Sequence, residues 1–89
     1  MSVLRFSELA CREVIGLPCG KRLGYISDLE LDVQCGKIIS ILLPEHRGLK
    51  GAFSRSEYRV RWQDIVTIGQ DLIFVNSWEK HSDFEKKNE

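Results

Sequence analysis

Five side chains of the sequence are the usual carriers of metal-binding or nucleophilic chemistry. They are Cys11, Cys19, Cys35, His46 and His81. Zinc sites usually draw on cysteine pairs separated by two to four residues, whereas seven and fifteen residues separate these cysteines. No histidine lies beside a cysteine along the chain, as a local Cys–His catalytic pair would require. We therefore expect no metal, no cofactor and no enzymatic activity. We also expect free thiols, because an odd number of cysteines is a poor disulfide framework.

Three carboxylates, Asp28, Glu30 and Asp32, alternate along one segment. On a strand their side chains share one face, with neighbours about 7 Å apart. The spacing is similar to that of the first ligands of a calcium-binding loop, but Val33 stands where such a loop needs glycine. The pattern is more typical of a solvent-exposed strand face, which could meet a basic surface on a partner.

Positive charge is concentrated in residues 46–61. This segment holds five Lys or Arg and one Glu, a local charge of +4, while thirteen residues of each sign give the whole chain a net charge of zero. The rest of the chain therefore carries −4. The zero sum argues against a general binder of nucleic acid or anionic membrane. The local cluster nevertheless offers cations for phosphates, and Phe53 and Tyr58 could stack on bases.

A long polar loop, residues 45–57, lies largely within this basic segment and is our candidate partner-binding surface. Long loops in compact domains are often functional. The candidate residues are Arg47, Lys50, Phe53 and Arg55. Phe53 is the best candidate for an exposed anchor because no strand or helix periodicity assigns it to the core. Arg59 and Arg61, by contrast, are expected on the outer face of a strand.

The remaining sequence predicts short strands joined by turns, after one helical turn at residues 7–10 capped by Ser7. The expected strands are residues 12–16, 21–33, 38–43, 58–62, 65–69 and 72–75. The second strand alternates, with Leu23, Tyr25, Leu29, Leu31 and Val33 inward and a bulge or bend at Gly24. Trp62 follows the inward phase of Tyr58 and Val60, so we expect it in the core or as a lid on the barrel, and not as a platform for a ligand.

Eighty-nine residues, 10.3 kDa, suffice for one domain. We predict an all-β fold, a small six-stranded and mostly antiparallel barrel, because closure removes exposed strand edges. We place the barrel in residues 1–76 and a polar tail in residues 77–89. In that tail, Trp78 and Phe84 could pack back on the barrel or support self-association.

The sequence contains no apolar run of the roughly 18–20 residues that a membrane span needs. Residues 1–6, MSVLRF, lack the apolar stretch of a secretory signal. We therefore expect a cytoplasmic protein without a membrane span.

Two stretches resemble the signatures of the PRC-barrel family. Residues 20–32 (GKRLGYISDLELD) and 36–39 (GKII) resemble its opening signature. Residues 62–65 (WQDI) and 68–75 (IGQDLIFV) resemble its closing one. The short length and the glycine-containing loop before the tryptophan are similar to the small YlmC/YmxH-type members, which are associated with spore-forming bacteria. The loop departs from the family pattern in its Glu45-His46-Arg47 and Arg55-Ser56-Glu57 segments.

The resemblance implies a compact β-barrel that serves as a non-catalytic protein-binding or adaptor module, related here to sporulation. Related domains occur in the photosynthetic reaction-centre H subunit and in the ribosome maturation factor RimM. A protein partner is therefore expected. The alternative, by analogy with RimM, is an RNA- or ribosome-associated factor.

Overall fold

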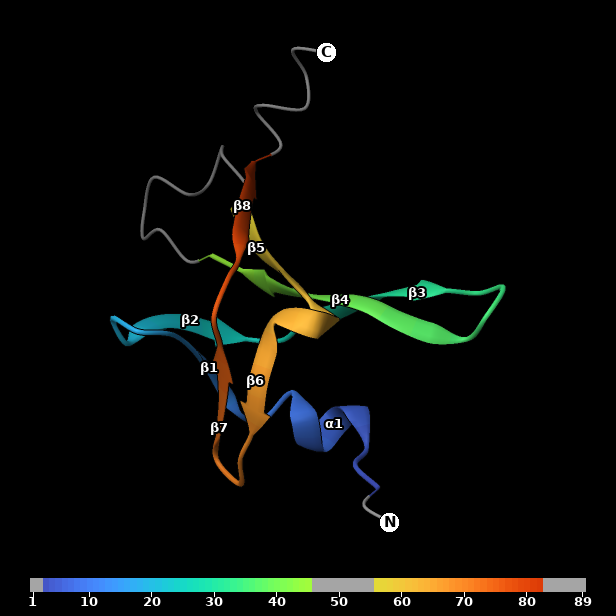
Figure 1. Cartoon of the computed structure of the whole chain (residues 1–89), viewed down its shortest axis with the longest axis horizontal. Helices are drawn as coiled ribbons and strands as arrows, with labels where there is room; N and C mark the ends of the chain where they lie inside the picture. The colour runs from blue at the N-terminus through green and yellow to red at the C-terminus, as the bar shows by residue number, and fades with distance from the viewer. Residues whose placement is uncertain (1–2, 46–55, 83–89) are drawn as a thin grey trace.

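The computed structural model describes residues 3–45 and 56–82 (Figure 1). Within these residues one short helix precedes eight strands. The elements are α1 (Phe6–Leu9), β1 (Glu13–Gly16), β2 (Lys21–Tyr25), β3 (Asp28–Asp32), β4 (Lys37–Pro44), β5 (Ser56–Arg61), the 3-10 helix η2 (Trp62–Asp64), β6 (Ile65–Ile68), β7 (Leu72–Val75) and β8 (Glu79–Ser82). The prediction of an all-β fold is confirmed.

The strands form two four-stranded sheets, with the orders β2-β1-β7-β6 and β3-β4-β5-β8. All neighbouring pairs are antiparallel except β1 and β7, which run parallel. In the described part of the chain the barrel is thus made of two separate sheets and not of one continuous ladder. The core lies between them, where the side chains with the least exposure are Val14, Ile41, Leu43, Val60, Ile73 and Val75.

The strand expected over residues 21–33 is two strands, and the prediction of one continuous inward phase was wrong. The backbone bends at Gly24, whose φ of +105° favours glycine, and the β1–β2 register shifts at the facing position. The bend changes which positions face the core. Leu23 and Ile26 are buried, whereas Tyr25 and Leu31, expected inward, are more than half exposed. The expected bend at Gly24 itself is confirmed.

The last residues before the described chain ends add the eighth strand. Residues 79–82, which the sequence placed in a polar tail, form β8 and pair with β5. Trp78 packs against the core, and a Cβ built on Gly16 would lie within 2.4 Å of its ring. The six strands counted from the sequence therefore become eight, through the divided strand and β8. The division at residue 76 stays a prediction, and Phe84 lies outside the described residues.

Two local predictions were wrong for a shared reason, a turn that starts earlier than expected. Arg5, not Ser7, caps α1, and its backbone N–H donates to Glu8 Oε1 at 2.8 Å. Trp62 opens η2 and does not continue β5, so the inward phase of that strand ends at Val60. The indole is consequently 37% exposed and not part of the buried core.

Candidate functional site

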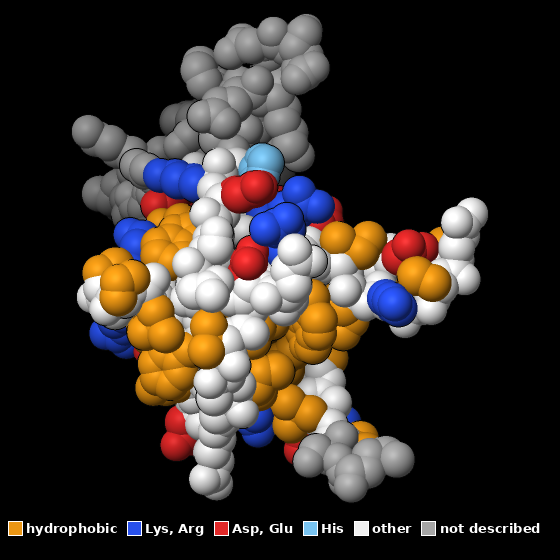
Figure 2. All heavy atoms as spheres, in the orientation of Figure 1, with side chains coloured by type: hydrophobic (Ala, Val, Ile, Leu, Met, Phe, Trp, Pro, Cys, Tyr) orange, Lys and Arg blue, Asp and Glu red, His pale blue; other side chains and the backbone are white. Residues whose placement is uncertain are grey.

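A groove of about 280 Å³ opens between α1, the base of the β3–β4 hairpin and the η2–β6 corner. Its lining is apolar except for Arg5. The other lining residues are Leu4, Phe6, Leu9, Leu29, Ile38, Trp62 and Ile68. We call this the apolar groove. Figure 2 shows hydrophobic side chains gathered between β6 and the base of the hairpin on this face.

The groove keeps large apolar side chains in contact with water. Phe6, on the first turn of α1, is 43% exposed, and Leu4, Trp62 and Ile68 are exposed to similar degrees. Single exposed apolar residues are normal on protein surfaces, but a contiguous group of them marks an interaction surface. Leu9 and Leu29 anchor the lining, because Leu9 is buried and Leu29 packs against the core. The groove is therefore a preformed concave surface with an apolar lining.

Of the residues that the structure describes, Arg5 is the one charged residue that lines the groove. Among residues 3–45 and 56–82, no ion pair includes its guanidinium. A carboxylate placed beside an apolar anchor would complement this cation. The groove is thus suited to an apolar side chain accompanied by an acidic group.

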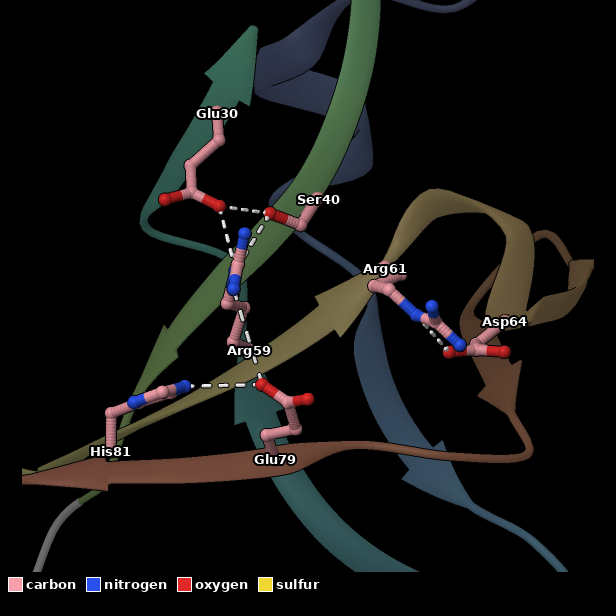
Figure 3. A network of polar contacts seen from close by, with 7 residues as sticks. All are labelled: Glu30, Ser40, Arg59, Arg61, Asp64, Glu79 and His81. Carbon is pink, nitrogen blue, oxygen red and sulfur yellow. Dashed lines mark hydrogen bonds and ion pairs between the residues drawn. The ribbon is translucent and has the colours of Figure 1, made fainter.

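A network of polar contacts lies on the outer face of the sheet β3-β4-β5-β8 (Figure 3). Unlike the apolar groove, it consists of charged and hydroxyl groups that bind one another. Arg59, on β5, donates from Nε to Glu30 Oε1 at 2.8 Å and to Ser40 Oγ at 3.3 Å. The buried Ser40 hydroxyl donates to the same Glu30 oxygen. Arg59 Nη1 also lies 4.0 Å from Glu79 Oε1, which His81 Nε2 approaches at 3.1 Å. We call these five residues the Arg59 network. It joins all four strands of its sheet.

Hydrogen bonding lowers the pKa of Glu30 below the ordinary glutamate value. The Ser40 hydroxyl is the largest cause, burial opposes it, and Arg59 adds both a hydrogen bond and its charge. A carboxylate held in this way stays ionised and stays on β3. The arrangement is structural, since each charge in the network has an opposite charge as its neighbour.

The second predicted outward arginine, Arg61, is also paired. Its Nε donates to Asp64 Oδ2 at 3.2 Å, three residues along the chain. The prediction that Arg59 and Arg61 belong to a strand face and not to a binding site agrees with these contacts. Asp28, Glu30 and Asp32 do alternate along β3, but Glu30 is held by the network and is not a freely solvated acid.

The thiols and histidines do not converge in the described structure. Cys11, Cys19 and Cys35 are free and exposed. In the two described stretches no group of three or more His, Cys, Asp or Glu side chains is placed to hold a metal ion. Over the same residues, the structure holds no helix long and apolar enough for a membrane span.

The loop candidates of the sequence lie outside the described residues. These are Arg47, Lys50, Phe53 and Arg55, together with His46. They stay predictions. The sequence analysis did not identify the groove. Leu4 and Phe6 lie near the start of the chain and Ile68 lies far along it, so no single motif joins them. The one local signal was the group of three apolar residues in VLRF, residues 3–6.

Comparisons with known proteins place the chain among a group of small bacterial proteins. The family model described as PRC-barrel domain matches residues 1–81. The "Probable sporulation protein YlmC" of Bacillus subtilis is 36% identical over 81 residues, which cover 90% of this chain and all of that protein. The "Uncharacterized protein YmxH" of the same organism is 32% identical over 75 residues, 82% of this chain and 88% of that protein.

A third relative comes from another genus. An uncharacterized protein of Clostridium acetobutylicum is 43% identical over 65 residues, which cover 72% of this chain and 74% of that protein. No solved structure matches the chain significantly.

Proposed function

Because the chain belongs to the PRC-barrel domain family, we propose that it is a non-catalytic, cytoplasmic adaptor that binds another protein during sporulation. The name of the Bacillus subtilis relative, a probable sporulation protein, supports the link to sporulation, since the two sequences align over all of that relative. The proposed binding role is supported by one observation above all, the apolar groove.

The chemistry of the groove favours a protein segment as its occupant. A volume of about 280 Å³ lies at the lower end of small-molecule sites and suits one or two large side chains. The lining offers aromatic and aliphatic surface, which supplies binding energy at the centre of protein interfaces. Arg5 adds a single charge at which an acidic residue of the partner can be oriented. The expected partner segment therefore carries an apolar anchor beside a carboxylate.

The loop candidates Arg47, Lys50, Phe53 and Arg55 form a second proposed surface on the same protein. Affinity capture from sporulating cells can separate the two surfaces. The baits are the wild-type chain, a groove variant (Phe6→Ala with Trp62→Ala) and a loop variant (Phe53→Ala with Arg55→Ala). Each variant truncates two side chains to alanine, two aromatic ones in the groove and one aromatic and one cationic in the loop.

We expect the groove variant to lose a partner that the wild-type bait retains. With that partner purified, its dissociation constant should rise at least about tenfold, the equivalent of about 1.4 kcal/mol. If only the loop variant loses the partner, the partner binds the loop and not the groove. Identical partners from all three baits would contradict the proposal.

The same affinity captures distinguish the alternative, an RNA- or ribosome-associated role, from binding to a protein partner. A protein that binds RNA displaces counterions from the phosphates. Added salt opposes this release, so the affinity for RNA falls steeply as the salt concentration rises. Arg59 and Arg61 are engaged by carboxylates of this chain, so they add little to a phosphate-binding surface. Recovery of RNA that is lost between low and moderate salt would favour the alternative.

A further inference from the structure

The hairpin of β3 and β4 ends in an arm with exposed apolar residues. We define the arm as residues 28–39. Its turn lies beyond the other elements on one side of the molecule (Figure 1). Val33 in the turn is 87% exposed and Leu31 on β3 is 56% exposed, and Ile39 on β4 is also exposed. These three residues have no role in the core of the single chain.

One face of the arm continues the wall of the apolar groove. Leu31 pairs with Ile38 across the hairpin, and both Ile38 and Leu29 line the groove. Leu29 and Leu31 share a face because side chains alternate along a strand. Glu30, between them, points to the opposite face and joins the Arg59 network. The arm therefore has an apolar face that runs out from the groove and a polar face that is occupied within the chain.

The charges of the arm and the groove are opposite. The arm carries three carboxylates and one lysine, a net charge of −2, whereas the groove carries Arg5. Asp32 remains a carboxylate near the tip, since its Oδ1 accepts the Gln34 backbone N–H at 3.0 Å. The whole chain has no net charge, so two copies experience no general repulsion.

We infer that the arm of a second copy of this chain occupies the apolar groove, in a reciprocal two-fold dimer. The inference rests on the proposed function, because it names a partner for the same groove. The arm has the chemistry expected of that partner, with Leu31 and Val33 as exposed apolar anchors and a net charge of −2 that complements Arg5. The arm and the groove share one continuous surface, so a two-fold axis across the arms places each tip at the other copy's groove.

This arrangement makes the groove a regulated surface. A sporulation partner and a second copy compete for the same apolar lining. The groove is therefore blocked in the dimer, and partner binding dissociates the dimer. Partner binding then weakens as the chain concentration rises, because dimer formation is a mass-action competitor.

Sedimentation equilibrium of the purified full-length chain over a concentration series tests the inference. The test variant is Val33→Lys, which changes an exposed turn residue and brings a cation toward Arg5 of the other copy. The matched control is Val66→Lys. Val66 lies on β6, an uncharged end strand of its sheet and another place at which two copies could pair. Circular dichroism checks that both variants are folded.

We expect a wild-type dimer, a dissociation constant raised at least about tenfold by Val33→Lys, and no comparable change with Val66→Lys. Dissociation by Val66→Lys alone would place the contact at β6 and overturn the inference. A monomeric wild-type chain would also overturn it. In that case groove-dependent capture of another protein would still leave the proposed function standing, so the two failures are distinguishable.

Discussion

The apolar groove and the Arg59 network show two opposite uses of exposed side chains. In the network, Arg59, Glu30 and Glu79 satisfy one another within the chain. In the groove, Phe6 and Trp62 remain in contact with water although an apolar side chain could cover them. Charge density alone would have pointed to the network as the binding surface. The contacts instead show that a surface whose groups are already paired gains little from a partner, whereas an open apolar surface gains free energy from one.

The groove side of this comparison is tested by Trp62→Ala. A fully buried tryptophan would cost about 3–5 kcal/mol of unfolding free energy, the value expected when the sequence placed Trp62 in the core. The indole is 37% exposed, so we expect about 1–2 kcal/mol, with a larger effect on binding than on folding. Urea unfolding of the variant measures the first quantity. A loss of 3 kcal/mol or more would return Trp62 to the core and weaken the groove as a binding surface.

The network side is tested by Arg59→Ala. The variant removes the contacts of Arg59 with Glu30, Ser40 and Glu79, and both ion partners are partly exposed, so we expect about 0.5–1.5 kcal/mol of destabilisation. Partner binding through the groove should be unchanged. The measurement is urea unfolding, together with capture by the variant bait.

Arg61→Ala is the matched control for Arg59→Ala. Arg61 lies on the same strand, but it has one exposed contact with Asp64, three residues along the chain. We expect at most about 0.5 kcal/mol of destabilisation. Equal losses from the two variants would mean that Arg59 does not hold the sheet together.

A smaller predicted effect concerns the pH dependence of the stability that Glu30 contributes to the Arg59 network. The pKa of Glu30 in the folded chain is lowered from the ordinary value of 4.5, first by the Ser40 hydrogen bond and then by Arg59. The unfolded chain therefore binds a proton at higher pH than the folded chain does. The stabilisation is complete above about pH 4.5 and is lost as the pH falls through the lower folded value.

Glu30→Gln removes this titration. Urea unfolding from pH 6 to pH 3 should show that the wild-type chain loses more stability in acid than the variant does. Parallel curves would mean that the ionised form of Glu30 does not stabilise the sheet. The groove variants should follow the wild-type pH dependence, since their substitutions do not alter Glu30.

The sequence predicted the parts of the fold that follow from local patterns. A nearly continuous apolar run located the strand around Ile41, alternation located the strand around Val60, and a glycine located the bend at residue 24. It did not predict β8, because residues 79–82 are polar and acquire a strand conformation only through pairing with β5. It also placed Tyr25 and Leu31 inward. The bend at Gly24 exposes Tyr25 and buries Ile26, whereas Leu31 is exposed because the end of the β3–β4 hairpin extends beyond the core.

The groove could not be predicted because the topology creates it. Phe6 is distant in the sequence from Trp62 and Ile68, and the three line one groove only because α1 lies near the corner formed by η2 and β6. The Arg59 network was hidden for the same reason, since it joins four strands. Positive charge in residues 46–61 was visible, but the carboxylates that engage Arg59 and Arg61 were not.

The most direct test of the groove as a protein-binding surface is the fluorescence of Trp62 in a Trp78→Phe variant. The chain has two tryptophans, so this variant reports on the groove alone. Acrylamide quenching is measured as the partner recovered with the wild-type bait is added, and separately as the chain itself is concentrated. We predict that quenching falls and that the emission shifts to shorter wavelength on binding. A complex that forms, as seen by sedimentation, while Trp62 stays equally quenchable would contradict the account.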